Sequence, residues 1–145
     1  SLQIGSRRGV LITGVLQDGP AGKGGAVVNI ASVAGKRLSH HGGADYTASK
    51  SAVLGFTRQA AFELAAHRIR VNAICPGLVL TPMVEAVTTA EQRDASAALI
   101  PLGRWIAPDD VAASVAFLAS DDAKFITGSQ LRIDAGGYVK MVPWK

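Results

Sequence analysis

Three side chains that can exchange a proton with an oxygen stand near one another in the sequence. Tyr46 and Lys50 are separated by one helical turn, and that spacing puts both side chains on one face of a helix. An ammonium beside a phenol favours the phenolate, so such a tyrosine can give or take a proton when a carbonyl and an alcohol interconvert. Taken alone, the pair could equally belong to a solvated helix face.

The third side chain is Ser32, which follows an apolar run at residues 26–31. That run is rich in β-branched residues and predicts a buried strand. In a doubly wound sheet, ligands bind beyond the carboxyl ends of the strands. A strand-end hydroxyl and the first turn of the next helix can therefore converge on one substrate oxygen. The alternative is a loop serine that bonds only the local backbone.

Several elements must position these residues. Residues 45–68 read as a long helix, with apolar positions Val53, Phe56, Ala60 and Leu64 at steps of three and four. Asp45 suits either the N-cap or the first turn of that helix. The alternating stretch 70–75 predicts a strand, which Pro76-Gly77 ends.

The rest of the chain continues the alternation. Thr81 fits an N-cap with Pro82 at the first helical position, and weaker helical character follows to about residue 99. A further helix opens at Pro108, and residues 130–134 predict a last short strand. Strands that alternate with helices indicate an α/β fold, with a parallel sheet covered on both faces.

The first 25 residues fit this scheme less well. Residues 10–13 read as a short strand, and the glycine-rich stretch 14–25 is expected to be a loop. The nine residues 17–25 are too few for a parallel crossover, which needs roughly a dozen. We therefore do not expect residues 10–13 to pair in parallel with residues 26–31.

The motifs together resemble those of the short-chain dehydrogenase/reductase family. The resemblance runs in order from about Gly25 to Val139. Its five segments are Asn29-Ile30-Ala31-Ser32-Val33-Ala34-Gly35, Tyr46-Thr47-Ala48-Ser49-Lys50, Val71-Asn72-Ala73-Ile74-Cys75-Pro76-Gly77, Pro101-Leu102-Gly103-Arg104-Trp105 with Pro108-Asp109-Asp110-Val111-Ala112, and Thr127-Gly128-Ser129-Gln130 with Asp134-Ala135-Gly136-Gly137. The implied fold is part of a Rossmann-like, doubly wound parallel sheet with flanking helices.

The resemblance implies a role for each matching residue. Tyr46 would be the general acid/base, Lys50 would hold the ribose hydroxyls of NAD or NADP, and Ser32 would donate a hydrogen bond to the substrate oxygen. The remaining residues would face the nicotinamide carboxamide and a nearby phosphate. They are the main chain of Pro76, Gly77 and Val79 and the hydroxyl of Thr81.

The sequence departs from the family pattern before residue 25. Relatives carry a glycine-rich loop after the first strand that holds the cofactor diphosphate at a helix N-terminus. Here Val15-Leu16-Gln17-Asp18 interrupts that pattern. We expect residues 1–24 to be a poorly matched segment, residues 25–145 to be the C-terminal part of one domain, and roughly a hundred residues of the two-half fold to be missing. A truncated sequence, a splice or frameshift product, and a remnant of a decayed gene all remain open.

Composition narrows the function classes. The 145 residues are 48% hydrophobic and 18% charged, with a net charge of +4 and a single cysteine, which indicates a folded domain without an internal disulfide. Three histidines without ligand spacing predict no metal site. No apolar run is long enough for a membrane helix, and no basic stripe with interleaved aromatics suggests a nucleic-acid partner. We expect a cytoplasmic location, because a lone cysteine suits a reducing compartment.

Two hypotheses follow. In the first, the chain belongs to an NAD(P)-dependent oxidoreductase that interconverts a secondary alcohol and a ketone as its small-molecule substrate, and it forms a homo-oligomer. In the second, it is a non-catalytic fragment that acts only in oligomer assembly or has no function. Cys75 is expected to be a small buried hydrophobic residue, and Trp105 either packs or lines a substrate pocket, with packing favoured.

Overall fold

The computed structural model describes residues 14–18, 24–39 and 42–139. Its centre is a four-stranded sheet with the strand order β1-β2-β3-β4. The strands are β1 (Gly14–Asp18), β2 (Gly25–Ile30), β3 (Ile69–Pro76) and β4 (Gln130–Ile133). Strands β2, β3 and β4 run parallel, whereas β1 pairs antiparallel with β2. The expected α/β class and the parallel sheet are confirmed.

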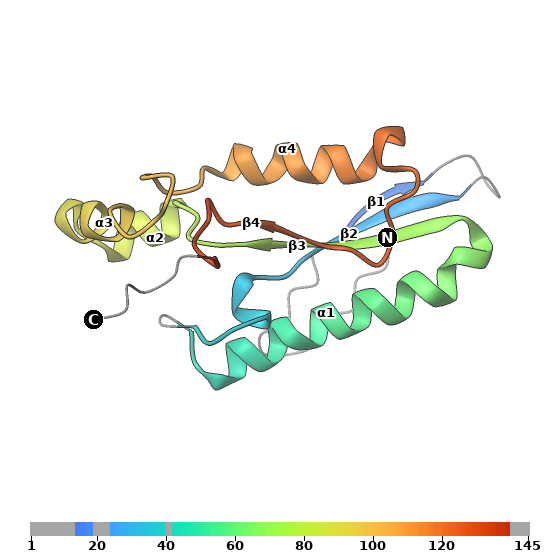
Figure 1. Ribbon diagram of the computed structural model, residues 1–145, viewed down its shortest axis with the longest axis horizontal. Coiled ribbons are helices and arrows are strands. Elements are labelled where there is room, and N and C mark those ends of the chain that lie inside the picture. Colours follow the sequence, from blue (N-terminus) through green and yellow to red (C-terminus); the bar gives the residue numbers. More distant parts are fainter. Residues whose placement is uncertain (1–13, 19–23, 40–41, 140–145) are drawn as a thin grey trace.

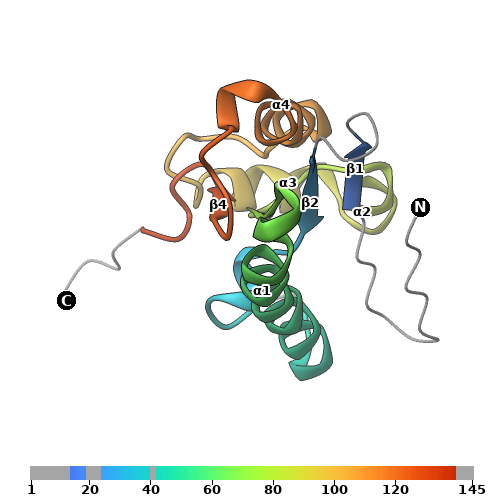
Figure 2. The same ribbon diagram turned by 90° about the vertical axis from the view of Figure 1, so that its right-hand side faces the viewer.

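Helices cover the sheet on both faces. The long helix α1 (Ala44–Leu64) lies against one face and α4 (Pro108–Ala119) against the other, and the turned view in Figure 2 shows the sheet between them. Because alternate side chains of a strand point to opposite faces, β3 serves both layers. Its Ala73 and Cys75 pack with Val53 and Leu54 of α1, whereas Ile74 packs with Leu118 of α4.

The expected α1 is confirmed, and its start is now placed. Gly43 is the N-cap and Asp45 lies in the first turn, where its carboxylate suits the positive end of the helix. A 3-10 turn, η2 (Ala65–His67), ends the helix before Arg68, whose left-handed backbone leads into β3. Phe56 was expected on the packed side but is 42% exposed. The buried stripe instead runs through Val53, Leu54, Thr57, Ala60 and Ala61.

The weaker helical region is two helices. They are α2 (Pro82–Val87) and α3 (Ala90–Ala97), separated at Thr88-Thr89. Thr81 is the N-cap of α2 as predicted, because its side chain accepts a hydrogen bond from Val84 N. Figure 1 shows both helices beyond the end of the sheet at which β3 finishes. This end also holds the carboxyl ends of β2 and β4, because the three strands are parallel.

The prediction of a loop over 14–25 is wrong for its first part. Residues 14–18 form β1, paired with β2 from Gly14↔Asn29 to Asp18↔Gly25. The glycines on either side led the sequence interpretation. An antiparallel neighbour needs only a short connection, so the minimum of roughly a dozen residues for a parallel crossover does not apply to it. The strand expected at residues 10–13 lies outside the described residues.

Candidate functional site

Ser32 stands where β2 ends. The strand's ladder continues one residue further, because Ala31 N donates to Ile74 O at 2.8 Å. Ser32 then becomes the N-cap of the short turn η1 (Val33–Gly35), and its Oγ accepts from Ala34 N at 3.1 Å. The residue is only 8% exposed. Its hydroxyl proton has no acceptor within the described part of the chain, so this buried hydroxyl keeps a donor available at the strand tip.

Tyr46 and Lys50 occupy the first two turns of α1 on the same side. Lys50 Nζ lies 5.7 Å from the centroid of the Tyr46 ring, and it donates to Ile30 O at 3.1 Å. The Lys50 side chain therefore reaches from the helix to the last residue of β2, two residues before Ser32. Tyr46 itself is 41% exposed, which leaves its ring accessible to a ligand.

No hydrogen bond joins Ser32 directly to Tyr46 in residues 14–18, 24–39 and 42–139. Lys50 links their surroundings instead, since it touches both the Tyr46 ring and the strand that carries Ser32. A Cβ added at Gly42 would lie 2.5 Å from Tyr46 Cδ1. The chain that enters α1 therefore packs directly on this ring, and it can do so only where the residue is glycine.

The electrostatics of this end of the sheet are set by burial and by cations. Burial lowers the pKa of Lys50 below its ordinary value, and the nearby Cys75 thiol opposes that shift. Burial raises the pKa of Cys75, while Lys36, Arg132 and Lys50 oppose that rise by favouring the thiolate. Cys75 is fully buried in the core cluster beneath α1, so the expectation of a small buried hydrophobic residue is confirmed.

The end of β3 and the segment after it hold the remaining residues of the predicted site. Pro76 is buried at the end of β3, and Gly77 N donates to Ile133 O at 2.9 Å. A Cβ at Gly77 would lie 3.0 Å from Asp134 Cα, so glycine lets this segment pass close to the end of β4. Val79 forms an isolated bridge with Ile106, and Thr81 caps α2. Pro76 ends β3 and the other three residues follow it, at the end of the sheet that carries Ser32.

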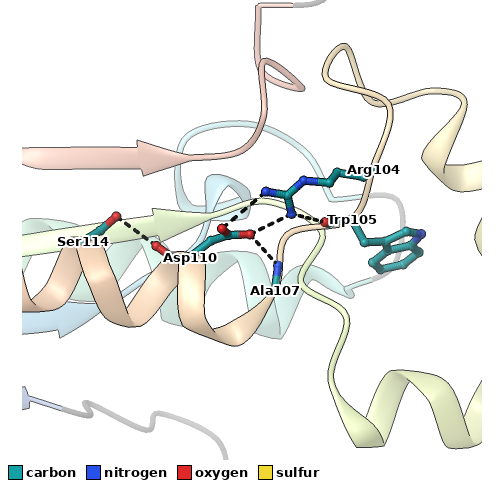
Figure 3. Close-up of polar contacts among 5 residues, drawn as sticks. All are labelled: Arg104, Trp105, Ala107, Asp110 and Ser114. Atoms are coloured by element: carbon teal, nitrogen blue, oxygen red, sulfur yellow. Dashed lines mark hydrogen bonds and ion pairs between the residues drawn. The ribbon is translucent and has the colours of Figure 1, made fainter.

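A polar cluster at the start of α4, to which the sequence motifs assigned no role, anchors the segment with α2 and α3. Arg104 and Asp110 form an ion pair at 2.8 Å, and Asp110 Oδ2 also accepts from Ala107 N at 2.8 Å. Figure 3 shows both contacts at the start of α4. The Asp110 pKa is held low by the Arg104 side chain first and by the Ala107 N–H second. The sequence shows that Arg104 and Asp110 carry opposite charges, but it does not show their backbone contacts with Trp105 and Ala107.

Trp105 completes this anchor. Its Nε1 donates to Arg93 O at 2.9 Å, which ties α3 to the segment before α4. Ile106 exchanges backbone hydrogen bonds with Leu78 and Leu80, so the strand-like stretch after β3 is fixed to the same segment. Trp105 is half-buried and fixed by this hydrogen bond, and the choice between packing and lining a substrate pocket stays a prediction. Together these contacts hold both ends of the segment 81–103 beside the candidate site.

The residues present suit one end of a nicotinamide dinucleotide. Lys50 spends one of its three N–H groups on Ile30 O, and the hydroxyls of Ser32 and Thr81 and the backbone after β3 stand at the same end of the sheet. The diphosphate end of such a cofactor needs a glycine-rich turn at a helix N-terminus. Among the described residues, no helix stands between β1 and β2. The fit is therefore to the nicotinamide-ribose end alone.

The described residues lack two features. They contain no group of three or more His, Cys, Asp or Glu side chains that could hold a metal ion. No helix within residues 14–18, 24–39 and 42–139 has both the length and the apolar character needed to cross a membrane.

The known proteins that this chain resembles are oxidoreductases by name. A protein-family profile described as enoyl-(acyl carrier protein) reductase matches residues 11–138. The chain is 41% identical over 116 residues to a (3R)-3-hydroxyacyl-CoA dehydrogenase of Rattus norvegicus, covering 80% of this chain and 44% of that protein. It is also 41% identical to a 3-oxoacyl-[acyl-carrier-protein] reductase of Staphylococcus aureus, covering 81% of this chain and 47% of that protein.

A solved structure agrees with these relatives. The acetoin dehydrogenase from Enterobacter cloacae superposes with a TM-score of 0.72 at 35% identity, covering 86% of this chain and 48% of that one. The chain spans about half the length of the curated relatives it matches. By their names these relatives are oxidoreductases, and the profile match extends over most of the chain. The chain therefore belongs to the short-chain dehydrogenase/reductase family.

Proposed function

We propose that this chain carries the acid/base side of an NAD(P)-dependent oxidoreductase that interconverts a secondary alcohol and a ketone. One observation carries the proposal. The Lys50 ammonium lies 3.1 Å from Ile30 O and 5.7 Å from the Tyr46 ring centroid. The ammonium therefore connects a solvent-accessible phenol to the strand tip that bears Ser32. The hydroxyls of Ser32 and Tyr46, beside this ammonium, can together bind a small carbonyl oxygen.

Tyr46 is proposed as the general acid and base. In the direction of reduction, the phenol gives its proton to the substrate oxygen as that oxygen becomes an alkoxide, and in the direction of oxidation it takes the proton back. NAD or NADP, when bound, accepts or supplies the hydride that the protein cannot. The 41% exposure of Tyr46 suits this role, because the substrate must reach the phenol.

Ser32 is proposed to orient the substrate oxygen. Its Oγ already accepts from Ala34 N, which fixes the side chain and leaves the hydroxyl proton to donate. A donor held in place before the reaction stabilises developing negative charge on the oxygen without having to reorganise. The residue's burial keeps bulk water from competing for that donor.

Lys50 and the segment after β3 are proposed to hold the cofactor. The two remaining N–H groups of Lys50 would bind ribose hydroxyls, while its bond to Ile30 O keeps the side chain extended. The main chain of Pro76, Gly77 and Val79 and the Thr81 hydroxyl would face the nicotinamide carboxamide and a nearby phosphate. The diphosphate itself must be held by residues outside this set.

Names of relatives suggest the substrate class. One relative is a dehydrogenase of 3-hydroxyacyl-CoA, one a reductase of 3-oxoacyl groups on a carrier protein, and one an acetoin dehydrogenase. All three names describe a secondary alcohol or the matching ketone. We propose the same small-molecule class here, with a cytoplasmic location, no nucleic-acid partner, and assembly as a homo-oligomer.

A second candidate, assembly without catalysis, is favoured by one specific observation. Helix α1 exposes Phe56 at 42% and Phe62 at 81%, and exposed aromatic side chains are typical of contact surfaces. In that case the chain binds copies or relatives through α1 and turns over no substrate. Sedimentation velocity, combined with the activity test below, distinguishes the two candidates. If the chain acts only in assembly, Phe62→Gln should abolish its association, and neither the wild-type chain nor any variant should show turnover.

Activity of the purified chain tests the main proposal. Turnover of acetoin and of 3-oxoacyl thioesters is followed at the absorbance of NADH and NADPH. We expect Tyr46→Phe and Ser32→Ala to reduce the rate by about 100-fold or more, and Ser96→Ala, a half-buried serine on α3, to leave it unchanged. A Tyr46→Phe variant that turns over substrate at the wild-type rate would overturn the proposal. A wild-type chain that shows no turnover with either NADH or NADPH would overturn it as well.

A further inference from the structure

A second cluster of charge lies next to the candidate site, around the turn that follows β4. The Tyr138 ring is contacted by two guanidinium groups: Arg132 Cζ lies 4.3 Å and Arg37 Cζ 5.7 Å from the ring centroid. The two groups therefore lie no further apart than the sum of those distances. Both arginines are exposed, although they come from positions nearly a hundred residues apart.

Among the residues that the structure describes, no carboxylate forms an ion pair with this cluster. Arg37 Nη1 donates to Gly137 O at 3.0 Å, which uses one of the five N–H groups of a guanidinium. Asp134 is the nearest acid in the turn, but its two oxygens accept from Gly136 N and Tyr138 N. Within the described residues, the only ion pair is Arg104–Asp110. Most N–H donors of the Arg37 and Arg132 guanidinium groups are therefore available to a ligand.

A third cation adds to the same field. Lys36 directly precedes Arg37 and is exposed. Lys36 and Arg132 both act on the buried Cys75 thiol at the end of β3, as Lys50 does. The positive charges of the cluster and of the candidate site therefore surround the same strand ends.

The turn also touches the elements that border the candidate site. A Cβ at Gly77 would lie 3.0 Å from Asp134 Cα and Cβ, and a Cβ at Gly136 would lie 3.0 Å from Pro101 Cβ. Leu102 N donates to Ala135 O at 3.2 Å. A ligand held by Arg37 and Arg132 would thus sit beside both the segment after β3 and the end of the segment 81–103.

We propose that Arg37 and Arg132, stacked on Tyr138 and supported by Lys36, form a binding site for a phosphate-bearing anion at the edge of the candidate active site. Guanidinium groups bind phosphate oxygens through paired N–H bonds, and the Tyr138 ring holds both groups in place through cation–π contacts. An anion between them also relieves the repulsion of two like charges held on one ring. The phosphate can come from the cofactor or from a phosphorylated substrate carrier.

Titration with inorganic pyrophosphate tests the site without requiring turnover. The arginine Nε–Hε signals of the ¹⁵N-labelled chain are followed by NMR at low ionic strength. We expect the signals of Arg37 and Arg132 to shift with saturation at roughly millimolar pyrophosphate, and Arg132→Gln to weaken that binding by about five-fold or more. Arg58→Gln, an exposed arginine on the outer side of α1, is the matched control and should bind like the wild type.

Two results would overturn the proposal. One is an absence of saturable shifts at Arg37 and Arg132. The other is equal weakening by Arg58→Gln and Arg132→Gln, which indicates general charge screening rather than a site. Circular dichroism of each variant shows whether the fold is intact. If Arg132→Gln unfolds the chain, Arg37→Gln takes its place, because Arg37 lies outside the sheet.

The source of the phosphate is then distinguished by competition. Coenzyme A and NADPH are each added to the pyrophosphate-bound chain, in the wild type and in Lys50→Met. Displacement by coenzyme A in both proteins supports a substrate carrier, whereas displacement by NADPH that is lost in Lys50→Met supports the cofactor. Failure of both compounds to displace pyrophosphate contradicts a site for phosphate-bearing ligands of this enzyme.

Discussion

The two helices on opposite faces of the sheet are held in different ways. Helix α4 is fastened at both ends by arginines: Arg104 pairs with Asp110 at its start, and Arg70 donates to Leu118 O at 2.6 Å and Ser120 O at 3.0 Å at its end. Helix α1 has no side-chain cap at its start. It is tied along its length instead, by Lys50 to Ile30 O and by Thr57 to Asn29.

This difference separates the helix that carries the candidate reactive residues from the helix that mainly stabilises the sheet. The first turns of α1 carry Tyr46 and Lys50, and burial further along the helix keeps them in position. Helix α4 carries no candidate reactive residue, and its fixed ends support the opposite face of the sheet. Substitutions in the first turns of α1 should therefore affect activity more than stability, and substitutions in or around α4 the reverse.

The largest effect is expected from Lys50→Met. Activity should fall by about 100-fold or more, because the ammonium beside Tyr46 is lost, while the free energy of unfolding at pH 7 should not fall in proportion. Burial lowers the pKa of Lys50, so the folded state bears a penalty below that pKa. This penalty disappears as pH rises through the folded value toward the ordinary 10.5.

Enzyme assays and denaturant unfolding at several pH values check this prediction. The free energy of unfolding of the wild type should increase relative to that of Lys50→Met as pH rises toward 10.5. Lys124→Met, at an exposed lysine beyond α4, is the control that should change neither activity nor its pH dependence. A large loss of stability in Lys50→Met with wild-type activity would reverse the comparison of the two helices.

Leu118→Ala is expected to have the largest effect on stability. Leu118 is 1% exposed and packs with Val28 and Ile74 beneath α4, so the substitution leaves a cavity and should reduce the free energy of unfolding by about 2–5 kcal/mol. Phe117→Ala, next to it but 43% exposed, should reduce it much less. Denaturant titration of both variants measures the contrast, and equal effects would mean that α4 does not pack as described.

Arg70→Met tests the fastening at the end of α4. The guanidinium satisfies carbonyls of Leu118, Ala119 and Ser120, and charged hydrogen bonds of this kind contribute about 1–3 kcal/mol together when partly buried. Thermal unfolding should show lower stability than in the control Arg58→Met. Unchanged stability would show that water replaces the arginine at this helix end without loss.

The smallest effect is expected from Asp110→Asn. Arg104 lowers the pKa of Asp110 in the folded chain, so the stabilisation is present above the ordinary value of 3.8 and is lost as pH falls through the folded value. The melting temperature of Asp110→Asn should therefore be slightly lower than that of the wild type at pH 7 and converge with it in acid. Asp109→Asn is the matched control, and a difference that persists in acid would exclude the ion pair as its cause.

The elements that sequence predicted well are those whose signal is local. The spacing of Tyr46 and Lys50, the Thr81-Pro82 helix start and the alternation around Cys75 each depend on a few neighbouring residues. The structure shows α1, α2 and β3 at these places. The functional roles of Ser32, Tyr46 and Lys50, and the division of the chain near residue 25, stay predictions.

What sequence could not give depends on partners far along the chain. Strand β1 was missed because its glycine-rich flank hid Val15 and Leu16, and only pairing with β2 defines it. Phe56 was placed on the wrong side of α1, because three apolar steps fit more than one stripe when alanines fill the rest. The contacts of Arg37 and Arg132 with Tyr138 join residues that no local pattern connects.

The most direct test of the central claim is a map of where NADH touches the chain. Backbone ¹H–¹⁵N signals are recorded as NADH is added to roughly millimolar concentration, where weak binding becomes visible. We predict shifts at Ser32, Lys50, Gly77 and Thr81, and none at the middle of α4. Unchanged signals at those four residues, or shifts confined to α4, would contradict a cofactor and substrate site at the carboxyl ends of β2 and β3.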